Sequence, residues 1–199
     1  MPLPAELLRR MSRQEMADLP IGRYEGEVLV VETQQDLERA SQDIRQESVA
    51  GFDTETRPAF RPGESYLPAL AQVATARAVY LFPLQRLDFS PEMAEILSSP
   101  ALVKAGVGLA DDLRQLKKMF AFEAAAVFDL GQAAKRHGAR QTGVRNLAGL
   151  YLGIRIPKGT KTSNWAAPRL SPQQVAYAAT DAWVCRELYL RFRELGMLP

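Results

Sequence analysis

The stretch "VAGFDTET", Val49 to Thr56, decides the fold, because it reads as a buried β-strand that carries two carboxylates. Asp and Glu are rare in strands, and an ionised carboxylate taken out of water without a partner is costly. Side chains alternate between the faces of a strand, so Asp53 and Glu55 point one way and Thr54 the other. Two like charges side by side repel unless a cation lies between them. The strand therefore predicts either a cation site or an edge or turn where both groups meet water.

The segments around this strand alternate between strand-like and helix-like patterns. Thr33 caps one predicted helix, and Ser171 followed by Pro172 begins the last one. Strands mixed with helices in this way predict an α/β domain with helices on both faces of the sheet. The patterns predict strands at 27–32, 48–56, 68–75, 78–83 and 101–107, and helices at 5–17, 33–46, 91–98, 109–120 and 171–195.

Length and composition limit the class of protein. A chain of 199 residues with 47% hydrophobic and 24% charged residues is typical of one globular domain. No apolar run has the length of a signal peptide or a membrane span, so we expect a cytoplasmic protein. The single cysteine, Cys185, and the single histidine, His137, exclude a Cys-based or His-rich metal site. A metal ion here would be held by oxygen ligands, which favours Mg²⁺, Mn²⁺ or Ca²⁺.

The last predicted helix carries an acidic residue on its apolar stripe. At 100° per residue, Asp181 falls in line with Val184, Leu188 and Phe192, which face the core. A buried charge needs compensation, and neighbouring turns of the helix supply none. A salt bridge to a distant arginine is one solution. A metal ion shared with Asp53 and Glu55 is the other.

The sequence "GVGLADDLRQL" adds a further candidate. On a helix that begins near Leu109, Asp112 lies at the edge of the apolar stripe and Asp111 almost opposite it. Both aspartates could simply favour the first turn through the helix dipole, but the position of Asp112 makes it the better candidate for a ligand. With Asp53, Glu55 and Asp181 it gives four carboxylates, enough for two hard divalent cations that clamp a phosphodiester.

The charge is unevenly distributed, although the net charge is only +2. No acidic residue lies between Asp129 and Asp181. A solvated basic face and a polyanionic partner both fit such a block, and a phosphate-handling site nearby favours the partner. The cations of the interval are Lys135, Arg136, Arg140, Arg145, Arg155, Lys158, Lys161 and Arg169.

Three motifs in order, "FDTE", "GVGLADD" and "YAATD", resemble those of the DEDD superfamily of 3′–5′ exonucleases. Tyr177 lies four residues before Asp181, the spacing of the tyrosine-bearing (DEDDy) branch, which includes ribonuclease D and the Werner-type exonuclease domains. The run "KTSNWAAPRLSPQQVAYAATDAW", residues 161–183, is similar to that branch. The histidine-bearing branch has His where this chain has Ala176. The resemblance implies a ribonuclease H-like fold with a mixed, five- to six-stranded sheet.

The resemblance also implies roles for the site residues. Asp53 would bridge two Mg²⁺ or Mn²⁺ ions, Glu55 and Asp181 would complete the shell of one, and Asp112 would act on the other largely through water. The hydroxyl of Tyr177 would orient the attacking water. The implied activity is hydrolysis of phosphodiester bonds from the 3′ end of DNA or RNA, which releases nucleoside 5′-monophosphates.

Seven further residues are candidates for contact with a single-stranded or 3′-recessed nucleic acid. They are cations, short polar groups and aromatic rings in loops near the motifs, where phosphates and bases could bind. For the tryptophan among them, packing beneath its loop is an equally good interpretation. These candidates are Arg57, Tyr66, Lys158, Lys161, Ser163, Asn164 and Trp165.

Two questions of organisation stay open at this stage. Residues 1–20 are expected to form an N-terminal arm, packed on the domain or on a second subunit, and residues 21–199 the exonuclease domain. Ribonuclease D carries further helical domains after its catalytic one, and this chain stops at Pro199, so we expect short substrates, partners or oligomers. A catalytically idle binding module and an oligonucleotide-specific nuclease or phosphatase are the alternatives. The complete set of acidic residues argues against the idle module.

Overall fold

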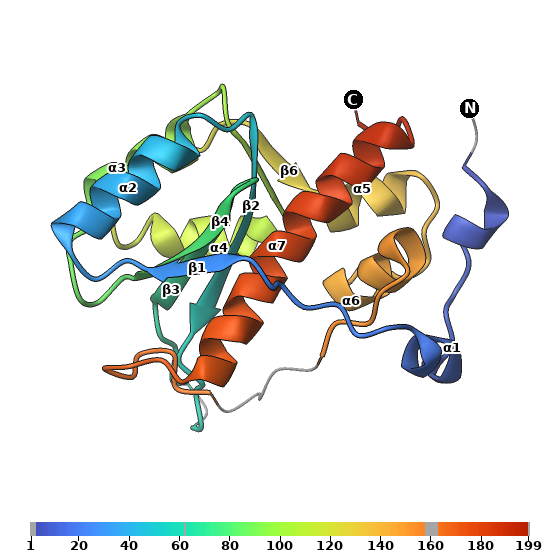
Figure 1. Cartoon of the computed structure of the whole chain (residues 1–199), viewed down its shortest axis with the longest axis horizontal. Helices are drawn as coiled ribbons and strands as arrows, with labels where there is room; N and C mark the ends of the chain where they lie inside the picture. The colour runs from blue at the N-terminus through green and yellow to red at the C-terminus, as the bar shows by residue number, and fades with distance from the viewer. Residues whose placement is uncertain (1–2, 62, 158–162, 199) are drawn as a thin grey trace.

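The computed structural model describes residues 3–61, 63–157 and 163–198. Figure 1 shows the helices and strands along this chain. In chain order they are η1 (Ala5–Leu7), α1 (Arg13–Asp18), β1 (Glu27–Val30), α2 (Gln34–Ile44), β2 (Val49–Thr56), β3 (Pro68–Ala74), β4 (Ala78–Pro83), α3 (Ser90–Ser98), β5 (Val103–Gly106), α4 (Leu109–Leu116), β6 (Val127–Asp129), α5 (Leu130–Arg136), α6 (Val144–Leu147), the π-helical turn η2 (Ala148–Leu152) and α7 (Pro172–Glu194).

The strands form one mixed sheet of six strands in the order β1-β4-β3-β2-β5-β6. The central strands β2, β3 and β4 are antiparallel neighbours. Parallel pairs join β1 to β4, β5 to β2 and β6 to β5. This arrangement confirms the predicted α/β fold with a mixed, five- to six-stranded sheet.

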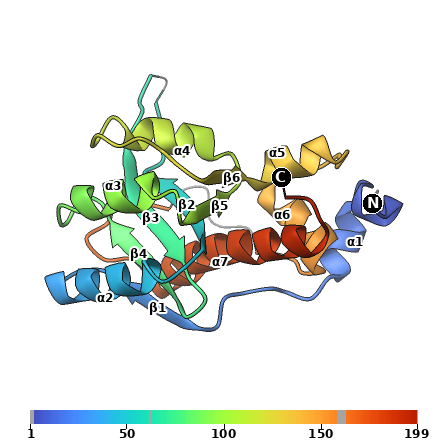
Figure 2. The ribbon, with the colours of Figure 1, turned by 90° about the horizontal axis from the view of Figure 1, so that it is seen from above.

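Helices cover both faces of this sheet, which explains the apolar character of its central strands. Every residue of β3 and β4 is buried, as is the first half of β2. Strands that read as continuous apolar runs are typical of sheets buried on both sides. One face packs against α2, α3 and α4, and the other against α7. Figure 2 shows α7 running along one side of the sheet with α4 on the other.

The close approach of α7 to β2 depends on small residues at the contact. Ala178, Ala179 and Ala182 of α7 are fully buried against the sheet. On β2, a Cβ atom at Gly51 would overlap the carbonyl oxygen of Ala182. Only glycine fits at that position without moving the helix. The contact fixes the distance between the middle of α7 and the strand that carries the acidic pair.

The edge of β2 next to the acidic pair is open. Strand β5 pairs with Val49 to Gly51 of β2 and then ends at Gly106. Gly108, with a φ of 77°, then turns the chain directly into α4. The second half of β2 therefore has β3 as its strand neighbour among the described residues, and the first turn of α4 beside its free edge. This arrangement brings Asp112 towards Asp53.

The N-terminal segment differs from the single predicted helix at 5–17. Ser12 caps α1 through a capping box with Glu15, so the chain forms a short 3₁₀ turn, η1, and a separate helix. Leu3, Leu7 and Met11 pack against the cluster formed by α5, α6, η2 and α7. The division into an arm and a domain stays a prediction. Within the described ranges, no helix has both the length and the apolar character needed to cross a membrane.

Candidate active site

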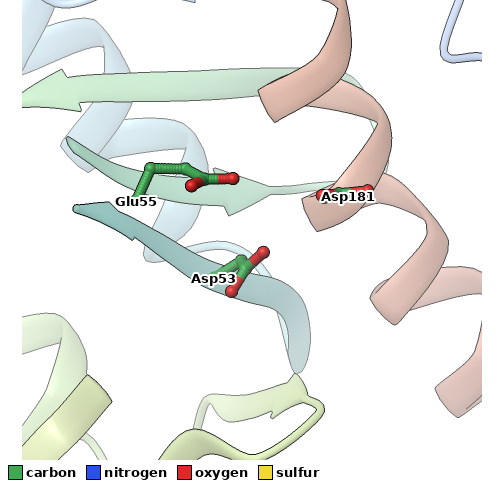
Figure 3. Close-up of side chains that lie close together, drawn as sticks. All are labelled: Asp53, Glu55 and Asp181. Carbon is green, nitrogen blue, oxygen red and sulfur yellow. The ribbon is translucent and has the colours of Figure 1, made fainter. Parts of the chain in front are cut away.

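Three acidic side chains from β2 and α7 converge on one point. Asp53, Glu55 and Asp181 each place one carboxylate oxygen within 4.8 Å of the other two. Figure 3 shows the pair on β2 facing Asp181 across a narrow gap. Asp181 is 6% exposed, as expected for a residue on the apolar stripe of α7. Within the described residues, none of the three forms an ion pair with a cationic side chain.

Burial raises the pKa of every member of the cluster, and repulsion between the carboxylates adds to the rise for two of them. Burial is the main cause for Asp53, and the charges of Asp181, Glu55 and Asp112 add to it, so the pKa of Asp53 lies well above its usual range. Burial, together with the charges of Asp181 and Asp112, raises the pKa of Glu55 to about 8. Burial raises the pKa of Asp181 to about 6. Carboxylates held together at such a cost are typical of a cation site, because a divalent ion offsets both the desolvation and the repulsion.

Asp112 joins the cluster from α4, on the other side of β2. Its carboxylate accepts a short hydrogen bond from the hydroxyl of Thr54, the residue between the two acidic positions of the strand. Burial raises the pKa of Asp112, and the Thr54 hydrogen bond opposes that rise. Asp111, in contrast, is exposed and pairs with Arg114 on the helix surface. The structure thus places Asp112 near the other carboxylates and Asp111 away from them.

Tyr177 lies one helical turn before Asp181 and on the same face of α7. Its hydroxyl donates a hydrogen bond that lowers the pKa of Asp181. Burial, followed by the charge of Asp181, raises the pKa of Tyr177 itself. The phenol therefore stays protonated at neutral pH and keeps a proton to donate. Arg145, from α6, is half-buried and lowers the pKa values of both Asp181 and Tyr177 through its charge.

The loop that follows β2 carries two of the predicted substrate contacts. The guanidinium of Arg57 lies 4.8 Å from the ring centre of Tyr66, a cation–π contact across the loop. Glu64 orders the same loop, since its carboxylate accepts the backbone N–H groups of Phe60 and Arg61 at 3.3 Å each. The loop continues directly from the strand of Asp53 and Glu55. Contact with nucleic acid at Arg57 and Tyr66 stays a prediction.

The remaining predicted contacts lie beside the first turns of α7. Ser163, Asn164 and Trp165 line a cavity of about 770 Å³ that Tyr177 also borders. Asn164 accepts a hydrogen bond at its backbone carbonyl from the side chain of Gln174. Trp165 is 6% exposed, and its ring centre lies 6.0 Å from that of Tyr177. The structure thus favours the packing role for Trp165. The predicted contacts Lys158 and Lys161 fall outside the described residues.

Sequence reasoning missed two side chains of the site. The strand period predicts that Thr54 points away from Asp53 and Glu55, but it does not name a partner for its hydroxyl. In the structure this hydroxyl donates a hydrogen bond to Asp112. Arg145 was one cation among eight in a block, with nothing in its neighbourhood to mark it. The single histidine, His137, is exposed, with its Nε2 3.3 Å from the carbonyl oxygen of Met197.

Known 3′-5′ exonucleases resemble this chain in sequence. A family model described as 3′-5′ exonuclease matches residues 28–196. The chain is 28% identical over 189 residues to the bifunctional 3′-5′ exonuclease/ATP-dependent helicase WRN of Mus musculus, covering 90% of this chain and 14% of that protein. It is 30% identical over 184 residues to ribonuclease D of Gluconacetobacter diazotrophicus, covering 90% of this chain and 44% of that protein.

A solved structure gives the same picture of the fold. The Aedes aegypti Nibbler EXO domain superposes with a TM-score of 0.78 at 21% identity, and the match covers 88% of this chain and 93% of that domain. Because the identity is low, this likeness speaks for the fold alone. The chain spans less than half the length of the first curated relatives it matches.

Proposed function

This chain belongs to the 3′-5′ exonuclease family, a family of hydrolases, and from that premise we propose that it is a metal-dependent 3′–5′ exonuclease. It would hydrolyse the terminal phosphodiester bond at the 3′ end of DNA or RNA and release nucleoside 5′-monophosphates. The observation that carries the proposal is the cluster of Asp53, Glu55 and Asp181, with carboxylate oxygens within 4.8 Å of one another. Tyr177 and Asp112 border that cluster.

The donor set of the cluster fits hard divalent cations. All the groups are carboxylates, and Mg²⁺ and Mn²⁺ prefer oxygen ligands. Asp53, Glu55 and Asp181 would hold one ion, and Asp53 with Asp112 a second. When bound, two such ions neutralise the phosphodiester and activate water for an in-line displacement. The raised pKa values of Asp53 and Glu55 support this assignment, because the cluster in the absence of a cation binds protons instead.

Tyr177 and Thr54 would prepare the site for the substrate. The protonated hydroxyl of Tyr177 is held against Asp181, from where it would orient the attacking water. Thr54 fixes the rotamer of Asp112 through its hydrogen bond. Partners that orient the ligands of a metal are needed for its affinity nearly as much as the ligands are. Tyr177 is the group that we propose to touch the reacting atoms, and Thr54 acts through Asp112.

The charge distribution supports a nucleic-acid substrate. Six cations of the interval 130–180 fall in the described part of the chain, and none of them forms an ion pair there. Unpaired surface cations attract a phosphate backbone and make binding depend on salt. The six are Lys135, Arg136, Arg140, Arg145, Arg155 and Arg169.

Digestion of 5′-labelled DNA and RNA strands of matched sequence with Mn²⁺ or Mg²⁺ tests the proposal. A ladder that shortens by single nucleotides from the 3′ end, absent with EDTA and absent in Asp53→Asn, is the expected result. Binding without products would make the protein an idle binding module. Release of phosphate from mononucleotides would make it a phosphatase. Comparison of the two ladders would also give the preference for DNA or RNA.

A further inference from the structure

A group of exposed cations lies at the end of the molecule that holds the N-terminal segment. Two cations come from that segment and three from the region of α5, more than 120 residues further along the chain. All five are exposed. Figures 1 and 2 show the segment with η1 and α1 beside α5 and α6, at the end of the molecule opposite α2. We call this the basic end surface, and its residues are Arg10, Arg13, Lys135, Arg136 and Arg140.

Contacts between the two segments hold these cations together. The backbone N–H of Met11 donates a hydrogen bond of 3.0 Å to Oε1 of Gln141, so Arg10 and Arg140 each lie next to one end of this bond. The side chain of Leu8 lies beside Gly138, since a Cβ atom there would be 3.8 Å from Cδ1 of Leu8. The segment from residue 8 to residue 11 therefore lies along the segment 138–141.

The basic end surface keeps its charge free. Among the described residues, no ion pair or hydrogen bond occupies the charged groups of its five cations. Glu15, which lies on α1 with Arg13, forms an ion pair with Arg9 and a capping box with Ser12. Elsewhere on the molecule, Arg39 of α2 and Arg45 just after its end are paired with glutamates at 2.7 Å. Cations that are left unpaired on a surface are available to an external polyanion.

The composition of the surface favours nucleic acid over a membrane. Proteins that lie on a bilayer insert apolar side chains beside their cations. The exposed large apolar residues of the described chain are Ile21, Phe60, Leu67, Leu87 and Val127, and none of them belongs to the N-terminal segment before residue 21 or to α5. A phosphate backbone needs only cations in reach.

The basic end surface also continues towards the active site. Arg145 follows Arg140 in the chain and lies on α6, which packs on α7. Its charge acts on Tyr177 and Asp181, as described above. Arg145 is thus a half-buried cation near the acidic cluster, five residues along the chain from Arg140 of the basic end surface.

We propose that the basic end surface binds the phosphate backbone of the substrate strand, several nucleotides upstream of its 3′ end. This inference rests on the proposed nuclease function and extends it, because it predicts that long strands bind better than short ones through residues remote from the carboxylates. It also gives the N-terminal segment a role in binding, through Arg10 and Arg13.

The test compares two triple variants that lose the same charge. One is Arg10→Ala, Arg136→Ala, Arg140→Ala in the basic end surface. The other is Arg39→Ala on α2, Arg45→Ala just after its end and Lys118→Ala just beyond α4. Anisotropy of a 5′-labelled strand of about twenty nucleotides, measured in EDTA across a salt series, reports binding without cleavage. Thermal unfolding checks that both variants keep the fold, since exposed substitutions change stability by only about 0.5 kcal/mol.

The first variant is expected to lose salt dependence that the control keeps. Each phosphate contact to a single strand contributes about 0.7 to the log–log slope, so three lost contacts flatten it by about 2. Between about 50 and 200 mM salt, the ratio of the wild-type affinity for the strand to the affinity of this variant would fall about 20-fold. The preference in kcat/KM for a strand of about twenty nucleotides over one of about four would fall as well.

Other results would overturn the inference. If the first variant keeps the salt slope of the wild type, the surface is not in contact with the strand. If the control variant shows an equal change, the effect comes from net charge and not from this surface. Binding to phosphatidylserine vesicles that the first variant loses, with an unchanged slope on the strand, would assign the surface to a membrane. Failure of the wild type to cleave any strand would refute the nuclease proposal instead, and the salt slope in EDTA would still report on the surface.

Discussion

Removal of one charge from the acidic cluster is expected to stabilise the metal-free protein at alkaline pH. The pKa of Glu55 is about 8 in the folded protein against 4.5 for an ordinary glutamate. Because the folded value is the higher one, the stability that Glu55 contributes is present at low pH and is lost as the pH rises through about 8. Between about pH 6 and pH 8 this loss amounts to about 2 kcal/mol. In Glu55→Gln it disappears.

Other groups also change the pH profile of the wild type, among them Asp53 and Asp112, whose pKa values lie above their usual range. The difference between the wild type and Glu55→Gln is therefore the quantity to measure. Asp181, with a pKa of about 6, adds a smaller loss of the same sign. Lys104, whose pKa burial lowers to about 8, acts in the opposite direction, because the folded protein gains as this buried cation loses its proton. Lys104 is present in both proteins, so its effect cancels.

Chemical denaturation or thermal unfolding in EDTA at several pH values would measure the difference. For a chain of this length about 2 kcal/mol corresponds to about 4–8 °C in Tm. Glu123→Gln, at a side chain that is 95% exposed, is the matched control and should follow the wild type. Saturating Mn²⁺ should stabilise the wild type more at the higher pH, because protons then compete less for the carboxylates. Parallel wild-type and Glu55→Gln profiles would refute the raised pKa of Glu55.

Four other substitutions test separate parts of the site. Thr54→Val should lower activity or Mn²⁺ affinity by about 10–100-fold, because Asp112 loses the group that orients it. Asp111→Ala, at an exposed side chain, should leave steady-state rates unchanged. A lower rate in Asp111→Ala would contradict the assignment of Asp112 as the ligand. Tyr177→Phe should lower kcat more than it changes binding of a strand, measured by anisotropy in EDTA. Gly51→Ala should lower Tm and weaken Mn²⁺ binding together, since the new Cβ pushes α7 away from β2; a normal Tm would show that the helix can shift without cost.

The elements that place the site were predictable because local patterns specify them. The alternation of "VAGFDTET" gave the strand and the shared direction of Asp53 and Glu55, and both are as predicted. The cap at Ser171 and the apolar stripe of α7 gave the helix and the inward position of Asp181. In each case the period of the secondary structure is enough to say which way a side chain points. The predicted helix at 5–17 failed because the capping box at Ser12 starts a new helix inside it.

Contacts made across the sheet were beyond the reach of these patterns. The hydrogen bond from Thr54 to Asp112 joins residues 58 positions apart, and it forms because β5 ends early and leaves one edge of β2 open to α4. Strand length and the angle of a turn set that geometry, and neither follows from periodicity. The positions of the surface cations could not be predicted either, because exposed charged residues do not follow the period of a helix or strand. In the sequence these cations form one block of eight, whereas in the structure Arg145 lies near Asp181, apart from Lys135, Arg136 and Arg140.

This separation of cations follows from what the acidic cluster requires. A cation within ion-pair distance of the carboxylates, in a partly buried site, would compete with a divalent ion for them. A polyanionic strand is nevertheless repelled by the same carboxylates until an ion is bound. Attraction must then come from cations outside the cluster. Since exposed charges act over a Debye length of only about 10 Å in about 0.1 M salt, these cations have to line the path of the strand itself, as proposed for the basic end surface.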